Sequence, residues 1–268
     1  MLSEYDPFPA SAAIQAGIAD NSSLVRRAAA RALSNADFRG RGLALAPLLL
    51  DPVRAVRLEA AETLAGVPPN ILPAGAASEL DSAIGEYIAA QKLNADRPEA
   101  HLNLGLLYAR ENHDNKAEAE LKIALSLDPA FVPAAINLAD LYRQVGNDTK
   151  GESVLRTAIA RSPSDASLQH ALGLLLIRQG HGKKALAHLA AAVRMDPTNA
   201  RFKYVYAVAL DEAGHRVEAL ETLKDALRNH PYDRETLAAL VSIYREAGSP
   251  DEALPYANRL KQLGRANP

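Results

Sequence analysis

The chain has 268 residues, of which 48% are hydrophobic and 23% are charged, and this is the composition of a folded protein. Its formal net charge of -2 gives no cationic field that would attract nucleic acid or an anionic membrane. The absence of cysteine excludes disulfides, thiolate metal ligands, a cysteine nucleophile and covalent c-type haem attachment. Aromatic residues make up only 5% of the chain while Ala and Leu dominate, which favours an all-α fold.

The first predicted elements, within residues 1–66, repeat with a period of 31 residues. The matching pairs are Asp20 with Asp51, Val25-Arg26 with Val56-Arg57, Ala29-Ala30 with Ala60-Ala61, and Leu33 with Leu64. This pattern resembles HEAT-like repeats of the short bacterial type, which implies paired helices. Two units are too few to bury a core alone, so we expect them either to stack on the half repeat at residues 76–95 or to continue upstream in a longer parent.

Residues 67–97 are predicted to form a Pro-rich connector and half a repeat. Ala83, Tyr87 and Ala90 have the spacing of a second repeat helix, but the run from Pro68 to Pro73 occupies the place of the first helix. The sequence therefore predicts one helix here, at about residues 76–95.

From residue 98 to 268 the period changes to 34 residues, and five units are predicted. A Gly that can end a first helix and a Pro that follows a second helix recur in successive units. These columns are Gly146, Gly180, Gly214 and Gly248, and Pro129, Pro163, Pro197 and Pro231. Together with Leu104-Gly105, Tyr108, Ala117 and Ala124 they resemble the tetratricopeptide signature over about residues 83 to 263. The resemblance implies a right-handed solenoid of helical hairpins.

Three positions depart from the pattern, namely Gly151, Val241 and Asn112. Asn112 stands where Gly would end the first helix of the first unit. Pro255 is predicted to interrupt the last helix near its first turn. That helix ends at Leu260 and Leu263 with no polar capping helix after it, so this end is a candidate surface for homo-oligomer formation.

The order of HEAT-like units, Pro-rich connector and tetratricopeptide array resembles the C-terminal half of certain bacterial multihaem cytochrome proteins. Their haem-attaching motif is absent here, so no cofactor is expected. The resemblance implies a soluble, periplasmic fragment or relative of a longer parent; without it, a cytoplasmic location is the expectation. No segment reaches the roughly 18 apolar residues of a membrane span.

Catalytic and metal-binding sites are not predicted. His113, His181 and His215 recur at one position, but this position is a turn where polar residues are expected anyway. Arg26, Arg27 and Arg31 could form a small phosphate-binding face, yet Arg26 belongs to the repeat signature, whose arginines bond within the stack. Nucleic-acid binding is therefore a minor alternative, and no enzyme activity is expected.

The predicted binding surface is the concave face lined by the first helices of the array. Helical periodicity assigns to it Leu102, Asn103, Leu106, Ile136, Asn137, Asp140, Arg143, His170, Leu174, Arg201, Tyr204 and Val208. We expect a peptide with apolar side chains there, its backbone held by Asn103 and Asn137 and an acidic group by Arg143 or Arg201. The predicted function is a non-catalytic protein-binding or peptide-binding scaffold. The alternatives are a self-associating structural module and the interaction half of a periplasmic cytochrome-type protein.

Overall fold

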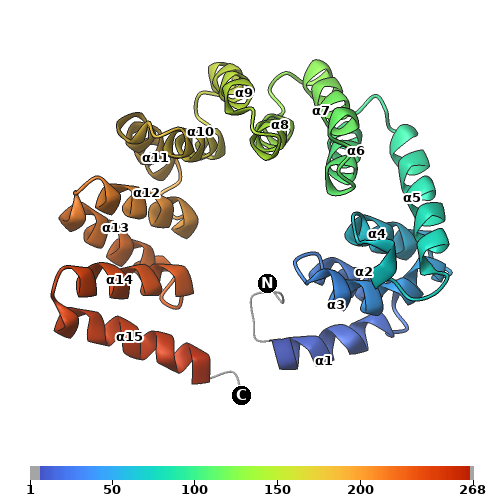
Figure 1. Ribbon diagram of the computed structural model, residues 1–268, viewed down its shortest axis with the longest axis horizontal. Coiled ribbons are helices and arrows are strands. Elements are labelled where there is room, and N and C mark those ends of the chain that lie inside the picture. Colours follow the sequence, from blue (N-terminus) through green and yellow to red (C-terminus); the bar gives the residue numbers. More distant parts are fainter. Residues whose placement is uncertain (1–6, 266–268) are drawn as a thin grey trace. The chain divides into compact units, whose positions relative to one another are not determined.

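The computed structural model describes residues 7–265, and within this range all regular structure is helical (Figure 1). The fold class predicted from the sequence is therefore confirmed. The chain divides into two compact units, Met1–Asp128 and Pro129–Pro268. The first predicted tetratricopeptide unit thus falls in the same compact unit as the 31-residue repeats. Residues 1–6 of the predicted HEAT-like segment and residues 266–268 of the predicted array lie outside the described residues.

Within residues 7–128, the first unit contains seven α-helices and two short 3-10 helices. They are α1 (Pro7–Ile18), α2 (Ser23–Ala32), α3 (Phe38–Leu45), η2 (Ala46–Leu50), α4 (Arg54–Leu64), η3 (Pro69–Ile71), α5 (Ala76–Lys92), α6 (Pro98–Arg110) and α7 (Asp114–Leu127).

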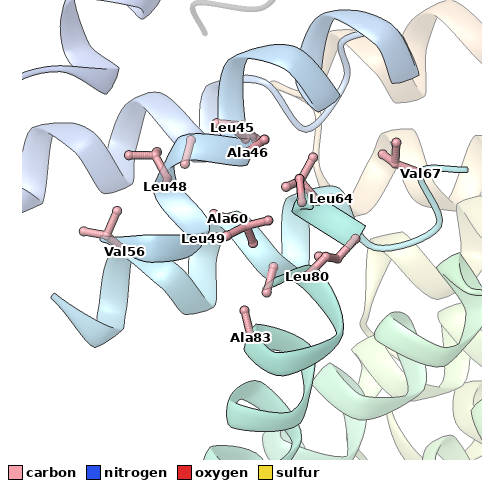
Figure 2. Packing of buried hydrophobic residues seen from close by; sticks show 13 residues of the cluster. Leu45, Ala46, Leu48, Leu49, Val56, Ala60, Leu64, Val67, Leu80 and Ala83 are labelled. Atoms are coloured by element: carbon pink, nitrogen blue, oxygen red, sulfur yellow. The ribbon is translucent and has the colours of Figure 1, made fainter. Parts of the chain in front are cut away.

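The 31-residue repeats form the hairpins α1–α2 and α3–α4, and α5 shares one core with them. Figure 2 shows Leu45, Val56 and Leu64 packed together with Leu80 and Ala83 of α5. Each fully buried Leu contributes about 1.5–3 kcal/mol through the apolar surface it removes from water. The repeats therefore obtain from α5 the additional apolar surface that two hairpins lack.

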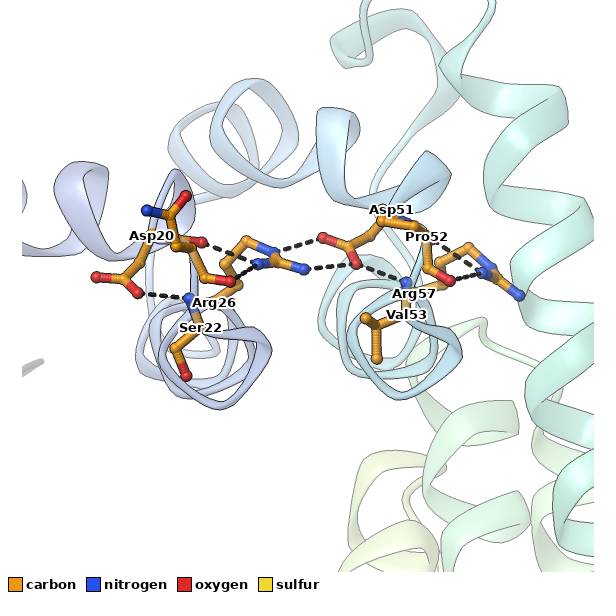
Figure 3. A network of polar contacts seen from close by, with 8 residues as sticks. Asp20, Ser22, Arg26, Asp51, Pro52, Val53 and Arg57 are labelled. Carbon is orange, nitrogen blue, oxygen red and sulfur yellow. Dashed lines mark hydrogen bonds and ion pairs between the residues drawn. The ribbon is translucent and has the colours of Figure 1, made fainter.

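The repeat-signature Asp and Arg residues form a ladder of polar contacts along these hairpins, with an ion pair between Arg26 and Asp51 (Figure 3). We refer to this ladder as the ion-pair ladder. Arg26 donates to both carboxylate oxygens of Asp51, at 2.6 and 2.9 Å, and also to the Asp20 carbonyl at 2.8 Å. One repeat later, Arg57 donates to the Asp51 carbonyl at 2.8 Å and to the Glu86 carboxylate at 2.7 Å. The signature arginines thus bond within the stack, as the sequence indicates.

A second core joins the 31-residue repeats to the hairpin α6–α7. Ala65 after α4, Tyr87 of α5 and Leu107 of α6 pack together, and all three are buried. Gly66 follows with a φ of +78°, and a Cβ built on it would lie 2.1 Å from the carbonyl oxygen of Arg110. The ends of α4 and α6 therefore approach each other through a position that only Gly can occupy.

The second unit contains eight helices in four hairpins. They are α8 (Val132–Gln144), α9 (Asp148–Arg161), α10 (Ala166–Arg178), α11 (Gly182–Met195), α12 (Ala200–Glu212), α13 (Arg216–Asn229), α14 (Arg234–Glu246) and α15 (Pro250–Arg265). Asp165, Asn199 and Asp233 recur every 34 residues, and each caps a first helix by accepting from a backbone N–H three residues later.

Small residues allow the two helices of a hairpin to approach each other. A Cβ on Gly105 would lie 2.7 Å from Cγ of Leu121, and a Cβ on Gly173 would lie 2.6 Å from Cδ2 of Leu189. Asn112 ends α6 with a φ of 59°, in the left-handed region that Gly146 occupies one repeat later with a φ of 73°. Asn therefore takes over the role of Gly in the first hairpin, because its side chain tolerates this conformation better than most.

One local prediction was wrong. Pro255 does not interrupt the last helix, because α15 is continuous from Pro250 to Arg265 with Pro255 inside it. Tyr256, Leu260 and Leu263 pack against the core that α14 forms with the preceding hairpin. This packing stabilises a helix that loses one internal hydrogen bond at the proline.

Candidate functional site

In the second unit, the residues predicted to bind a peptide lie on the accessible side of three first helices. Their buried neighbours on the same helices, such as Leu138 and Leu172, face the core. The accessible set is Ile136, Asn137, Asp140 and Arg143 on α8, His170 and Leu174 on α10, and Arg201, Tyr204 and Val208 on α12; each is exposed or half-buried. We refer to these nine residues as the first-helix surface.

The first-helix surface carries apolar and aromatic side chains among its polar ones, namely Ile136, Leu174, Tyr204 and Val208. Leu174, whose exposed fraction is 38%, and Val208 occupy equivalent positions of adjacent repeats. The His170 ring lies 4.6 Å from the Phe202 ring, measured between centroids. Burial, together with the nearby Arg201 guanidinium, lowers the pKa of His170 to about 4. His170 is therefore neutral at pH 7 and adds to the apolar character of this surface.

Ion pairs flank the apolar residues. Arg143 contacts Asp140 at 2.5 Å, and Arg201 contacts Glu235 of α14 at 2.6 Å. The Arg201 guanidinium also lies 5.5 Å from the centroid of the Tyr204 ring. An acidic ligand group would have to displace Asp140 or Glu235, and exposed ion pairs of this kind contribute only about 0–1 kcal/mol each. Both arginines are therefore available to a ligand at small cost.

The two asparagines expected to hold a peptide backbone have different surroundings. Asn137 donates to the Pro133 carbonyl of its own helix at 2.8 Å. Asn103 donates to the side-chain oxygen of Gln91 at 3.1 Å. Asn103, Leu102 and Leu106 lie on α6 in the first unit, where they are half-buried. That these three residues bind the same peptide as the nine residues of the second unit remains a prediction.

Asn103 instead lines a polar pocket of the first unit, with a volume of about 490 Å³. The same pocket is lined by Arg27 and Arg31, which the sequence analysis considered only as part of a phosphate-binding alternative, and by Glu59, which it did not assign to a ligand site. Glu59 is the residue from which this pocket could have been predicted. It directly precedes the signature pair Ala60-Ala61, and an acidic residue at this position falls on the buried side of its helix. Its side chain is 6% exposed and needs cationic partners.

The recurring histidines are found at exposed turns. His113, His181 and His215 each directly precede a second helix. Among the described residues, no group of three or more His, Asp or Glu is arranged to hold a metal ion. Over the same range, every helix is too short or too polar to cross a membrane.

These features define an all-helical repeat protein built from 34-residue hairpins with an accessible first-helix surface. A family model described as tetratricopeptide repeat matches residues 113–265, and the chain belongs to this family. The match covers the second helix of the first predicted unit and the four units that follow. No match was found among curated proteins.

Solved structures share this fold at low sequence identity. The crystal structure of MamA has a TM-score of 0.54 and 18% identity, over 63% of this chain and 92% of MamA. MamA from Desulfovibrio magneticus RS-1 gives a TM-score of 0.54 and 17% identity, over 63% and 96% of the two chains. YrrB, a TPR protein with an unusual peptide-binding site, gives a TM-score of 0.50 and 19% identity, over 65% and 90%.

Proposed function

We propose that this chain is a non-catalytic scaffold that binds a peptide or a segment of another protein on its first-helix surface. The observation that carries the proposal is the recurrence of accessible apolar side chains at one position in adjacent repeats, as at Leu174 and Val208. A peptide in extended or helical form presents apolar side chains at regular intervals, and a repeat surface matches such a ligand with one contact per unit.

Two further observations support the proposal. The chain belongs to the tetratricopeptide repeat family, whose members generally act in protein interactions. YrrB, which shares the fold, is described as having a peptide-binding site. The ligand expected here is apolar with an acidic group, since Arg143 and Arg201 lie beside the apolar residues in weak, exchangeable ion pairs.

The experiment is affinity capture from a lysate of the source cells with the intact chain and with Leu174→Glu, followed by mass spectrometry. A charge at this position should repel an apolar ligand without unfolding the chain, because Leu174 is already 38% exposed. The matched control is Val217→Glu on α13, a second helix, where the side chain is 73% exposed.

Proteins lost with Leu174→Glu and kept with Val217→Glu would support the first-helix surface as the binding site. Equal capture by all three chains would refute it.

A further inference from the structure

The polar pocket of the first unit is formed by four helices. Residues of α2, α4, α5 and α6 line its volume of about 490 Å³, so the 31-residue repeats and the first tetratricopeptide hairpin both contribute to it. It lies apart in sequence from the first-helix surface, all of whose residues follow Pro129. The function proposed above does not use it.

Glu59 fixes two guanidinium groups at this pocket. Nε of Arg27 donates to Oε2 of Glu59 at 2.7 Å, and Nε and Nη2 of Arg31 donate to Oε1 and Oε2 at 2.7 and 2.8 Å. Burial alone would raise the pKa of Glu59, but the hydrogen bonds from Arg31 and Arg27 hold it below its ordinary value. The carboxylate is therefore charged at neutral pH and orients both arginines.

The two guanidinium groups keep donors for a further acceptor. A guanidinium carries five N–H donors, and Glu59 uses one from Arg27 and two from Arg31. The side chains of Arg27 and Arg31 are 46% and 65% exposed, so these donors are accessible. A carboxylate matches the planar geometry of such donors.

The charge of the pocket favours an anion. Arg27, Arg31 and Arg110 line it together with Glu59 and Glu62, which leaves one net positive charge in a chain whose formal net charge is -2. The pocket lining therefore holds more positive than negative charge.

Amide groups also line the pocket. Asn103 donates to Gln91 at 3.1 Å, and both side chains line the pocket. Carboxamides of this kind bond the N–H and C=O groups of a peptide backbone. The pocket thus combines guanidinium donors for a carboxylate with two carboxamide side chains that can bond a peptide backbone.

We propose that this pocket binds an acidic peptide segment, with an Asp or Glu carboxylate on the outer donors of Arg27 and Arg31 and the backbone beside Asn103 and Gln91. The segment is a second ligand or a second part of one partner, and the site works independently of the first-helix surface. The charge match and the donor geometry select an acidic segment over an apolar one.

The experiment measures binding of a fluorescent Glu-rich peptide to the full chain by anisotropy at low salt, with a Gln-rich peptide of equal length as the second probe. The test variant is the triple change Arg27→Gln, Arg31→Gln and Glu59→Gln, which removes the arginines without leaving a buried carboxylate unpaired. Arg54→Gln is the matched control, since Arg54 is a half-exposed arginine of α4 that contacts Glu86 outside the pocket. Circular dichroism verifies that every variant is folded.

We expect the Glu-rich peptide to bind, the Gln-rich peptide to bind at least tenfold more weakly, and the triple variant to lose roughly tenfold or more in affinity. Arg54→Gln and Leu174→Glu should bind as the parent does, and this separates the result from the test of the first-helix surface. Equal binding of both peptides, unchanged binding by the triple variant, or displacement of the peptide by inorganic phosphate at a comparable concentration would overturn the proposal.

Discussion

Gly66 shows how one residue connects two kinds of repeat. Its φ of +78° is left-handed, and its missing side chain leaves room for the Arg110 carbonyl. The Arg110 side chain in turn donates to the Glu62 carbonyl at 2.8 Å, in the last turn of α4. A larger residue at position 66 would separate the ends of α4 and α6 and break this contact.

Gly66→Ala is therefore expected to lower the free energy of unfolding of the first unit by more than the ~1–3 kcal/mol that left-handed strain alone costs. The matched control is Gly75→Ala, where φ is +87° but no atom lies within 4 Å of the added Cβ. Differential scanning calorimetry of both variants measures the difference. Equal losses would show that the close approach to Arg110 contributes nothing.

Asp51 makes the stability of the ion-pair ladder depend on pH. The hydrogen bonds from Arg26, opposed by burial and aided by the Val53 N–H, lower the pKa of Asp51 below its ordinary value near 3.8. A lowered pKa means that the folded state binds fewer protons than the unfolded state at acidic pH. The stabilisation is complete above the ordinary pKa and is lost as the pH falls through the lowered one.

Asp51→Asn should thus be less stable than the parent at pH 7 and should lose less stability between pH 5 and pH 3. Thermal unfolding followed by circular dichroism at several pH values tests this. Some acid sensitivity will remain in the variant, because hydrogen bonds from Arg57 also lower the pKa of Glu86. A variant that loses as much stability as the parent would contradict the role assigned to Asp51.

At the scale of one element, α15 contains a proline that its packing tolerates. Pro255 cannot donate to the Asp251 carbonyl, and it lies beyond the first turn, where the N–H groups would be unpaired anyway. The inward contacts of Tyr256, Leu260 and Leu263 compensate for the missing bond.

Pro255→Ala should restore this hydrogen bond and stabilise α15 by up to about 3 kcal/mol. The control is Pro250→Ala, because Pro250 is the first residue of the helix, where proline is well tolerated. Hydrogen exchange of the α15 amides measures the effect. Slower exchange with Pro250→Ala and not with Pro255→Ala would reverse this interpretation.

The helices of the array were predictable because each has a local cause that recurs every 34 residues. Gly146 and its equivalents end first helices through a positive φ, and Asn112 substitutes for them in the first hairpin. Pro255 was misjudged because the tertiary contacts of Leu260 and Leu263 outweigh a local penalty. The pocket at Glu59 was missed for a related reason, since it depends on four helices whose packing no periodicity describes.

At the scale of the whole molecule, the terminal helix bears on the alternative of self-association. Leu260 and Leu263 are partly buried against the core of their own unit. Among the large apolar residues in the described part of α15, Leu254 is the one that is strongly exposed. A stable dimer usually buries about 800 Å² on each partner. The described part of α15 offers little apolar surface for such an interface.

We therefore expect one species of 28.6 kDa at all concentrations in sedimentation equilibrium. A mass that increases with concentration would favour the self-associating module, and Leu254→Lys should then reduce the increase. Val217→Lys, a comparable change on α13, is the control for a general effect of added charge.

The ion-pair ladder also restricts how the length of this protein can change. Arg26 donates to the Asp51 carboxylate and Arg57 donates to the Asp51 carbonyl, so Asp51 serves two neighbours at once (Figure 3). An additional copy of residues 20–50 inserted before Asp51 would bring one signature Asp, equivalent to Asp20, and one signature Arg, equivalent to Arg26, so the ladder would stay paired. A unit that lacked its signature Asp or Arg would leave a guanidinium or a carboxylate of the ladder without this partner, so the ladder stays intact only when repeats are added or removed as whole units.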